Sequence, residues 1–435
     1  MGENDMLMAI LTDGSSTQQP AALEHSRPKS PLGLHAIRFA AIYYTSILLY
    51  WPLSAIPGVP QFGQKWMADA WLPLVRFVGA HVFGATNANL YQSSGGSDSV
   101  FDYLQNACAL AIAAIGVVVW RFALPKTSSP ERVYAYLRLF LRYLLATVML
   151  EYGVMKPWQF PAPSKLELSQ SFGSEVPMGL LWNFVGASRG YTIFSGAVEV
   201  VVGLLILSRR TTLLGACLGR GVTLNIFALN LFYDVPVKLF SLQLLIACLI
   251  LIAPDTKRLA GLFLLDRTAS PSPESKRGPN SGPPTSARRA AIVAEALYCL
   301  VLIGQTLWLP IRASARVSAE EGYDVRGLWD VVSYRAQPTP PSRWKQVTID
   351  QVYGRWMSRV DFEDGHGLDG PAVYDGTALT LPAPHGALTW ECRFPTPDHM
   401  VLTRGSMRIE LKRNDQSLSL MGHHIHWIQD PAGSP

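Results

Sequence analysis

The stretch that decides the fold runs from Tyr191 to Phe232 and reads YTIFSGAVEVVVGLLILSRRTTLLGACLGRGVTLNIFALNLF. Its two apolar runs, Tyr191 to Leu207 and Thr211 to Phe232, flank the basic pair Arg209-Arg210. A helix needs about 20 apolar residues to cross about 30 Å of hydrocarbon, and each run is close to that length. The sequence therefore predicts two antiparallel transmembrane helices joined by a tight turn.

Apolar runs of the same kind recur over most of the chain. Of its 435 residues, 49% are hydrophobic and only 16% are charged, whereas globular proteins contain about 25% charged residues. This composition predicts a mainly α membrane protein, a polytopic bundle of about seven spans. The expected spans are Leu34 to Leu53, Tyr103 to Phe122, Leu137 to Met155, Tyr191 to Leu207, Thr211 to Phe232, Val237 to Ala253 and Ala290 to Ile311. A weaker stretch, Trp66 to Ala85, contains Asp69, Arg76 and His81 and is expected to lie in the membrane interface.

The basic residues predict the orientation of these spans. Lys and Arg gather at the membrane edges of alternate connections, at Arg27 and Lys29, at Arg121, Lys126 and Arg132, at Arg209 and Arg210, and from Lys257 to Arg289. Cytoplasmic loops carry such an excess of positive charge. We therefore expect a multi-pass protein of the inner (plasma) membrane whose N-terminus is cytoplasmic and whose C-terminal domain is extracytoplasmic.

The pattern of residue types changes after Ile311, where the long apolar runs end. Short strand-like runs are separated by Gly, Pro and Asp turns. These runs are Trp344 to Ile349, Gly354 to Phe362, Ala378 to Leu381, Ala387 to Phe394, Met400 to Leu402, Ser406 to Leu411 and Leu418 to Ile428. Several short strands with regular turn signals are typical of an antiparallel β-barrel or sandwich. The C-terminal part is therefore expected to form a small β-domain.

These patterns divide the chain into six parts. Two segments rich in Ser, Pro and charge lack apolar periodicity and cannot bury enough surface to fold. The expected parts are 1–33, a disordered cytoplasmic tail; 34–133, the first two spans and the interfacial stretch; 134–267, a four-helix membrane core; 268–289, a disordered cytoplasmic linker; 290–311, the seventh span; and 312–435, the β-domain.

Several classes of function are disfavoured by composition and motifs. The five cysteines are scattered and form no CxxC pair or disulfide framework. The net charge of +5 comes from residues beside the apolar runs, so nucleic-acid binding is not expected. The chain contains no Walker loop, no GxGxxG fingerprint before a helix, no HExxH and no GxSxG motif. No intrinsic cofactor is therefore predicted.

Two charged residues share a depth near the middle of the expected membrane. Glu199 lies ten residues before Arg209, and Arg220 lies nine residues after Thr211, so both are about 14 to 15 Å from the inner edge at 1.5 Å per residue. Because an ionisable residue in a span is costly, we expect Glu199 and Arg220 to form an ion pair between adjacent helices. This pair would either fix the register of the two helices or help to bind a ligand or relay protons.

Other polar residues complete the set of ligand-binding or proton-relay candidates. Glu151 lies below the outer interface, with Lys156 as the nearby cation on the same helix, and Asn230 is expected on the polar side of its span. Asp234 and Lys238 flank Pro236 at an outer helix start, where Asp234 suits either a helix cap or a site residue. His424 and His426 would share one face of a strand, but two histidines without a third ligand make only a weak metal candidate. No metal site is predicted.

Four segments carry a resemblance to a known family. They are Arg142 to Lys156 (RYLLATVMLEYGVMK), Gly196 to Leu205 (GAVEVVVGLL), Arg209 to Gly215 (RRTTLLG) and Tyr233 to Lys238 (YDVPVK). Together they resemble the DoxX-like membrane proteins over about Leu137 to Asp255. The resemblance implies a four-helix membrane unit, and some DoxX and DoxD relatives serve as membrane subunits of thiosulfate:quinone oxidoreductase or in redox-stress complexes.

Three functions remain open from the sequence. The first is a quinone-linked or redox-associated membrane subunit that takes electrons from a partner subunit. The second is a membrane-anchored binding or scaffold protein whose β-domain recruits an extracytoplasmic partner, and the third is a small-solute transporter. The sequence leaves open whether the chain is an enzyme. Purification with co-purifying quinone would favour the first function.

Overall fold

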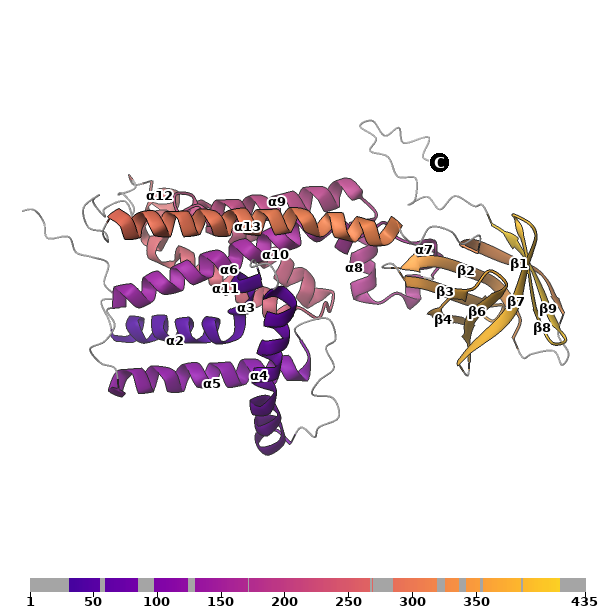
Figure 1. Cartoon of the computed structure of the whole chain (residues 1–435), viewed down its shortest axis with the longest axis horizontal. Coiled ribbons are helices and arrows are strands. Elements are labelled where there is room, and N and C mark those ends of the chain that lie inside the picture. Colours follow the sequence, from indigo (N-terminus) through magenta and orange to yellow (C-terminus); the bar gives the residue numbers. More distant parts are fainter. Residues whose placement is uncertain are drawn as a thin grey trace, which may run out of the picture.

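The computed structural model describes residues 31–54, 59–84, 98–123, 130–170, 172–266, 268, 285–318, 325–335, 342–352, 355–384 and 386–414. In Figure 1 a bundle of long helices occupies one side of the molecule and an antiparallel β-barrel the other. The described part of the chain therefore has the two-part organisation that the sequence predicts.

Among the described residues, five helices are long and apolar enough to cross a membrane. They are α5 (Val100–Ala123), α6 (Pro130–Gln159), α9 (Arg189–Leu207), α10 (Thr212–Phe232) and α11 (Lys238–Ile252), which continues into η2 (Ala253–Asp255) and α12 (Thr256–Leu264). The predicted count of seven is thus supported for five spans. The other two expected spans lie on α2 (Pro31–Leu48) with α3 (Tyr50–Ser54) and on α13 (Thr285–Ser318), whose apolar run from Val293 to Trp308 is shorter. Both α2 and α13 run alongside the five helices in Figure 1.

The bundle has two distinct ends. The end nearer the β-domain, here called the barrel end, also carries α7 (Lys165–Ser169), η1 (Phe172–Ser174) and α8 (Pro177–Gly186). The opposite end, here called the distal end, contains the C-terminus of α9 and the short helix α12. The helix α4 (Val59–Val82) lies across the bundle axis in Figure 1, which is the direction expected of an interfacial helix.

Helix α6 forms the centre of the bundle and is the most buried of the five. Leu141, Leu144, Leu145 and Ala146 are fully inaccessible, and α6 contacts α2, α9, α11 and α13.

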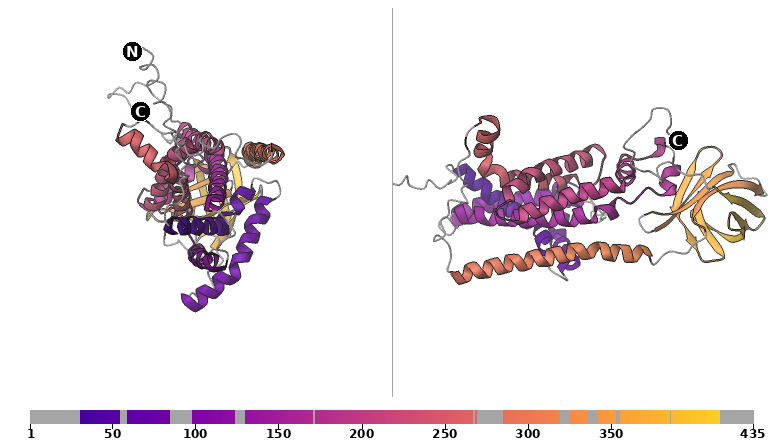
Figure 2. Two further views of the ribbon diagram at one scale, coloured as in Figure 1. Left: turned by 90° about the vertical axis from the view of Figure 1, so that its left-hand side faces the viewer. Right: turned by 90° about the horizontal axis from the view of Figure 1, so that it is seen from above.

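Figure 2 shows α13 as a separate rod along one flank of the bundle. Exposed apolar side chains cover the outward faces of α5, α9 and α10, as expected where lipid replaces water.

The β-domain is a single antiparallel sheet of nine strands that is nearly closed. Its strands are β1 (Gly327–Arg335), β2 (Trp344–Val352), β3 (Arg355–Phe362), β4 (Gly367–Pro371), β5 (Val373–Tyr374), β6 (Ala378–Ala383), β7 (Gly386–Thr396), β8 (His399–Arg404) and β9 (Met407–Arg413), in the order β4-β3-β2-β1-β9-β8-β7-β6-β5. Gly370 of β4 lies against Pro382 of β6, where the two ends of the sheet approach each other. Near-closure leaves little exposed sheet edge.

The barrel core follows from the alternation of side chains along the strands. Residues of one parity, such as Val347 and Ile349 of β2 and Leu379 and Leu381 of β6, are fully buried and meet Trp329 inside. The sequence predicts strands at β2, β3 and β6 to β9 but overlooks β1, β4 and β5. Asp330 and Ser333 interrupt the apolar residues of Gly327–Arg335, and Gly367–Pro371 contains Gly and Pro, so neither carries a strong strand pattern. The predicted run from Leu418 to Ile428 lies outside the described residues.

Two element boundaries differ from the sequence-based division. Helix α13 begins at Thr285, inside the predicted linker 268–289, and continues to Ser318, beyond the predicted end of the seventh span. The reason is local, since Ser286, Ala287, Arg288, Arg289, Ala290 and Ala291 are compatible with a helix although they are too polar for a span. The apolar run from Ala290 to Ile311 is therefore shorter than the helix that contains it.

Candidate functional site

A buried ion pair within the bundle joins Lys156 of α6 to Glu199 of α9. The Lys156 ammonium donates to Oε1 of Glu199, and the two side chains are only 15% and 3% exposed. Oε2 of Glu199 is buried and has no hydrogen-bond partner within the described residues. Both residues are candidates from the sequence, but the sequence does not predict that they meet.

Close approach of the two helix backbones makes this pair possible. A Cβ atom built on Gly153 of α6 would lie 2.7 Å from the carbonyl oxygen of Gly196 of α9, and one built on Gly196 would lie 2.3 Å from the carbonyl oxygen of Gly153. Only glycine permits this separation, and small residues at helix contacts are typical of membrane bundles. Lys156 and Glu199 each follow one of these glycines by three residues, so the close contact brings the charges together.

The predicted ion pair between Glu199 and Arg220 is wrong. Arg220 lies on an exposed face of α10, and Glu199 is buried against α6 and binds Lys156 instead. The two residues do share a depth, but depth does not fix the rotation of a helix about its axis. Asn230 of α10 is buried, as predicted for the polar side of this helix, and Thr223 is buried as well, whereas Arg220 is exposed.

Glu151 has a different partner from the one expected. Oγ of Ser54, in α3, donates to Oε1 of Glu151 at 3.2 Å, and no ion pair joins Glu151 to Lys156 among the described residues. Beside Glu151, the rings of Trp51 and Phe240 stack at 5.0 Å between centroids, and Tyr152 lies 5.9 Å from Trp51. Glu151 therefore lies at the edge of an aromatic cluster in which α3, α6 and α11 meet.

Asp234 and Lys238 form a contact at the barrel end with Asp98, a residue that the sequence analysis overlooks. Both carboxylate oxygens of Asp98 accept from the first backbone amides of α11, those of Lys238 at 2.7 Å and Leu239 at 2.9 Å. Lys238 Nζ also lies 2.7 Å from Asp234 and 3.6 Å from Asp98. Asp98 is thus the cap of α11, whereas Asp234, whose side chain is 82% exposed, is not.

A neutral polar network lies deeper in the bundle, between α2, α5 and α11. Gln243 Nε2 donates to the hydroxyl of Tyr43 at 2.8 Å and to Oδ1 of Asn106 at 2.7 Å, and the Tyr43 hydroxyl donates to the same oxygen at 2.8 Å. The backbone carbonyl of Gln243 accepts from Tyr44. The amides Asn106 and Gln243 inside apolar runs are the sequence signal that could reveal this network, since buried polar groups need partners.

The distal end contains a second group of charges. Arg142 donates to the backbone carbonyls of Ile206 at 3.3 Å and Leu207 at 2.6 Å, at the C-terminus of α9. Glu295 of α13 lies 3.4 Å from Arg142 and 2.7 Å from Arg209. Glu295 is not among the residues predicted from the sequence, although it is the one acidic residue in the predicted span Ala290 to Ile311. The contacts of Glu295 hold α13 against α6 and against the turn that follows α9.

Two titratable groups of the β-domain have pKa values that are shifted for clear reasons. Hydrogen bonds from the backbone amides of Ala378 and Thr377 lower the pKa of Asp375 from its ordinary value. Burial raises the pKa of the Cys392 thiol to about 12, so this cysteine is unreactive at neutral pH. No group of three metal-binding side chains occurs among the described residues, and the histidines His424 and His426 lie outside them.

Taken together, the site residues from the sequence fall into separate places. Lys156 and Glu199 meet, Glu151 lies five residues before Lys156 on α6 with another partner, and Asp234 and Lys238 lie at the barrel end near Asp98. Arg220 and Asn230 join neither group. The role of these residues in binding a ligand or relaying protons stays a prediction.

Comparison with known proteins finds similarity to a bacterial protein. Over 84 residues, 19% of this chain, the sequence is 34% identical to the uncharacterized protein YwoB of Bacillus subtilis (strain 168). The matched residues span about half, 54%, of the length of that relative. No family model matches the chain, and no solved structure matches it. The chain is therefore similar, over part of its length, to a protein that is itself described as uncharacterized.

Proposed function

We propose that this protein is a membrane-anchored scaffold whose helical bundle carries the β-barrel and whose barrel recruits a partner. The observation that carries the proposal is the junction at Asp350 of β2, a carboxylate that is only 1% exposed. Oδ2 of Asp350 accepts from the backbone amide of Lys165 in α7 at 2.7 Å, and Oδ1 accepts from Nε of Arg326 at 2.7 Å. A buried carboxylate that accepts several hydrogen bonds holds the elements that donate them in one arrangement.

Helix α7, which connects the barrel to the bundle, is held in place by its own cap and by contacts with β2. Ser164 and Glu167 form a capping box at its N-terminus, and Leu166 is buried. Ser169 adds a hydrogen bond of 3.4 Å to Thr348 of β2. Because α7 lies between α6 and α8 in the chain, these contacts connect the barrel to the bundle through a short ordered segment.

The polar groups of the bundle also fit an anchor. Arg142 binds the C-terminus of α9, Asp98 caps α11, and Lys156 pairs with Glu199 between α6 and α9. Each of these contacts joins two or more helices. Such hydrogen bonds and ion pairs between helices support a fixed arrangement of the bundle. They do not require a catalytic reaction or a bound ligand inside it.

For the orientation, we propose that the distal end faces the cytoplasm and the barrel lies outside the inner (plasma) membrane. Arg121, Arg209, Arg210, Lys257 and Arg258 lie at or near the distal ends of their helices. Positive charge at the membrane edge favours the cytoplasmic side. The N-terminus is then cytoplasmic, as the sequence predicts.

Photo-crosslinking in cells of the source organism tests the scaffold function. A photoreactive amino acid replaces Val332 or Val373, which are 55% and 60% exposed on the barrel, and Phe263, 75% exposed on α12, serves as the control position. We expect a crosslinked protein band of defined mass at the two barrel positions and not at Phe263. The absence of protein crosslinks at both barrel positions would contradict the proposal.

A second function, a quinone-linked or redox-associated membrane subunit, rests on a different observation. Oε2 of the buried Glu199 has no hydrogen-bond partner among the described residues, and the aromatic cluster of Trp51, Tyr152 and Phe240 lies beside Glu151 on the same helix as Lys156. The resemblance to DoxX-like proteins supports the same function. Small-molecule sites combine apolar and aromatic side chains with a few polar groups. Such a combination suits the polar headgroup of a quinone.

Mass spectrometry of the purified protein tests this second function. If it is correct, quinone should co-purify with the wild-type protein in mild detergent, and the variants Glu199→Gln and Glu151→Gln should lose it. Arg220→Gln, which alters an exposed residue, should retain it. Wild-type protein free of quinone, or equal quinone in all variants, would rule out this function.

A further inference from the structure

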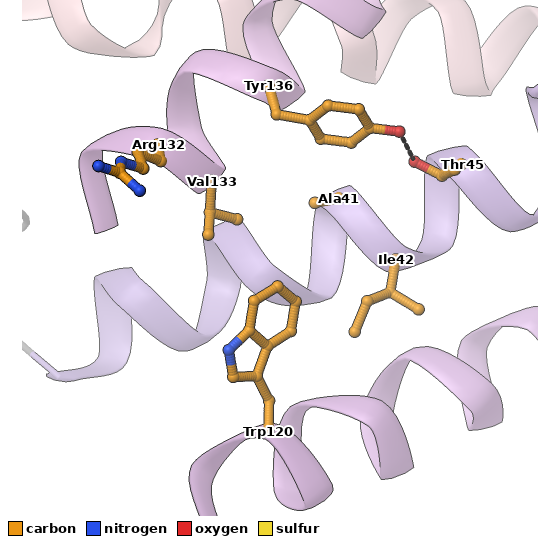
Figure 3. A pocket seen from close by; sticks show the side chains of 7 residues that line it. All are labelled: Ala41, Ile42, Thr45, Trp120, Arg132, Val133 and Tyr136. Atoms are coloured by element: carbon orange, nitrogen blue, oxygen red, sulfur yellow. Dashed lines mark hydrogen bonds between the residues drawn. The ribbon is translucent and has the colours of Figure 1, made fainter. Parts of the chain in front are cut away.

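A groove at the distal end of the bundle combines an apolar trough with a positive rim. It has a volume of about 430 Å³, within the usual range of about 300 to 1,000 Å³ for small-molecule sites. Its lining comes from three helices and consists of Ala41, Ile42 and Thr45 of α2, Trp120 of α5, and Arg132, Val133 and Tyr136 of α6. In Figure 3 the side chains of Val133, Ala41, Ile42 and Trp120 surround the trough, and Arg132 lies at one end of it.

The opposite end of the groove is closed by a hydrogen bond. The hydroxyls of Thr45 and Tyr136 lie 2.9 Å apart, which Figure 3 shows as a dashed line. Arg132 is near the start of α6 and Trp120 near the end of α5, so the positive rim is at the distal end and the hydroxyl pair lies deeper in the bundle. The groove is therefore amphipathic along its length.

Arg38 provides the observation that points to an anion. Arg38 precedes Ala41 and Ile42 by one turn of α2, is only 5% exposed, and lies with its Cζ atom 5.1 Å from the ring centroid of the groove residue Trp120. Nε of Arg38 is buried without a hydrogen-bond partner, and no carboxylate forms an ion pair with Arg38 among the described residues. A buried cation is costly unless an anion pairs with it.

The surroundings of Arg38 increase the positive potential. Arg121 lies on α5 next to Trp120, with its Nη1 atom 3.4 Å from Nε2 of His35, and Arg132 is exposed on the rim. Glu131 is the one acidic residue in the described first turn of α6. Arginine binds phosphate groups with two parallel hydrogen bonds, and basic pockets between transmembrane helices are suited to anionic lipid headgroups.

We propose that this groove binds an anionic phospholipid. The phosphate lies at the rim between Arg38 and Arg132, and one acyl chain extends along Ala41, Ile42 and Val133 towards the hydroxyl pair. The apolar trough is the part that a free phosphate ion would leave empty, so the combination of cations and trough favours a lipid. The proposal is independent of the scaffold function, because the groove lies on the other end of the bundle from the barrel.

Native mass spectrometry of the full-length, delipidated protein tests the proposal. The protein is titrated with dioleoyl phosphatidylglycerol or with dioleoyl phosphatidylcholine, two lipids that share their acyl chains and differ in net charge. We expect at least tenfold tighter binding of phosphatidylglycerol. Arg38→Gln and Arg132→Gln should each remove most of this preference, and Arg132→Gln serves as the informative variant if replacement of the buried Arg38 prevents folding.

Arg210→Gln is the matched control, since it removes an exposed charge from the same end of the bundle without altering the groove. It should retain the preference for phosphatidylglycerol. Equal binding of the two lipids, or equal loss in Arg210→Gln and Arg132→Gln, would overturn the proposal. Inorganic phosphate that displaces phosphatidylglycerol completely at millimolar concentration would assign the site to a free anion and would also overturn it.

Discussion

At the scale of single residues, the central feature is a buried charge pair whose two members come from different helices. Glu199 is 3% exposed and its single cationic partner among the described residues is Lys156. Removing one member of a buried pair leaves the other charge uncompensated, whereas removing both avoids this cost. The pair therefore should behave as a unit in mutational experiments.

We expect Lys156→Met alone to destabilise the folded protein by about 3 to 5 kcal/mol, because it leaves the Glu199 carboxylate buried without a cation. The double variant with Glu199→Gln should recover a large part of this loss. Unfolding of the detergent-solubilised protein, followed by circular dichroism across a denaturant series, measures both effects.

Arg220→Gln provides the control for this experiment. Because Arg220 is exposed and does not contact Glu199, its replacement should change the free energy of unfolding by no more than about 0.5 kcal/mol. Coupling between Glu199 and Arg220 in a double-mutant cycle would show that the pairing seen here is not the one that operates.

At the scale of helices and turns, the packing of α6 on α9 depends on two facing glycines. Gly153 and Gly196 each occupy a position where an added Cβ atom would meet the carbonyl oxygen of the other residue. The two backbones cannot separate without also separating Lys156 from Glu199. The two glycines therefore allow the close helix contact that the ion pair needs.

Gly196→Ala should lower the free energy of unfolding by about 1 to 3 kcal/mol, the range for overpacking a tight contact. The matched control is Gly221→Ala on α10, where an added Cβ would meet no atom within 4 Å. There alanine should stabilise the helix by up to about 1 kcal/mol. Thermal unfolding in the same detergent compares the two variants, and equal effects would contradict the tight contact between α6 and α9.

The turn between β5 and β6 makes a separate prediction about pH. The pKa of Asp375 is lowered by hydrogen bonds from the amides of Ala378 and Thr377 and from the Thr377 hydroxyl. A carboxylate with a lowered folded-state pKa stabilises the fold above its unfolded-state value of about 3.8, and this contribution is lost as the pH falls through the folded-state pKa. The contribution is therefore complete at neutral pH and absent in strong acid.

Asp375→Asn should thus be less stable than the wild-type protein at pH 6, and the difference should shrink towards pH 2. Thermal melts of the full-length protein at the two pH values, followed by circular dichroism in the strand region, measure this change. A difference between wild type and variant that is the same at both pH values would show that ionisation of Asp375 does not stabilise the turn.

At the scale of the whole molecule, the two largest hydrophobic cores of the described residues share no residue. The bundle core is centred on α6, and the barrel core on Trp329 and Trp390. Between them, the contact of α7 with β2 includes the buried carboxylate of Asp350. We expect each core to resist opening independently and the junction to respond to changes at Asp350.

Hydrogen exchange followed by mass spectrometry tests this division. Asp350→Asn leaves Arg326 without its carboxylate partner, at a cost of about 1 to 3 kcal/mol, so exchange in α7 and β2 should become roughly 5 to 150 times faster. Peptides from the centre of α6 should exchange as in the wild type. Glu391→Gln, at an exposed position of β7, is the control and should leave all of these rates unchanged.

Much of the fold could be predicted from the sequence. Apolar runs such as Arg189–Leu207 and the alternating pattern of β2 are local properties, so they identify helices and strands before any contact is known. Lys156, Glu199 and Lys238 could be selected for the same reason, since a charge in an apolar run is evident from the sequence. Five of the seven expected spans are long and apolar enough to cross a membrane.

The sequence by itself thus determined which segments are apolar helices, where the charges lie along them, and that a β-domain follows. Only the tertiary structure decided that Glu199 meets Lys156 and not Arg220, that Asp98 caps α11, and that Glu295 joins α13 to α6 and to the turn after α9. It also decided that the nine strands of the described residues nearly close. The physical reason is that depth and periodicity are set along one segment, whereas partners depend on how each helix is rotated about its axis and on contacts between residues far apart in the chain.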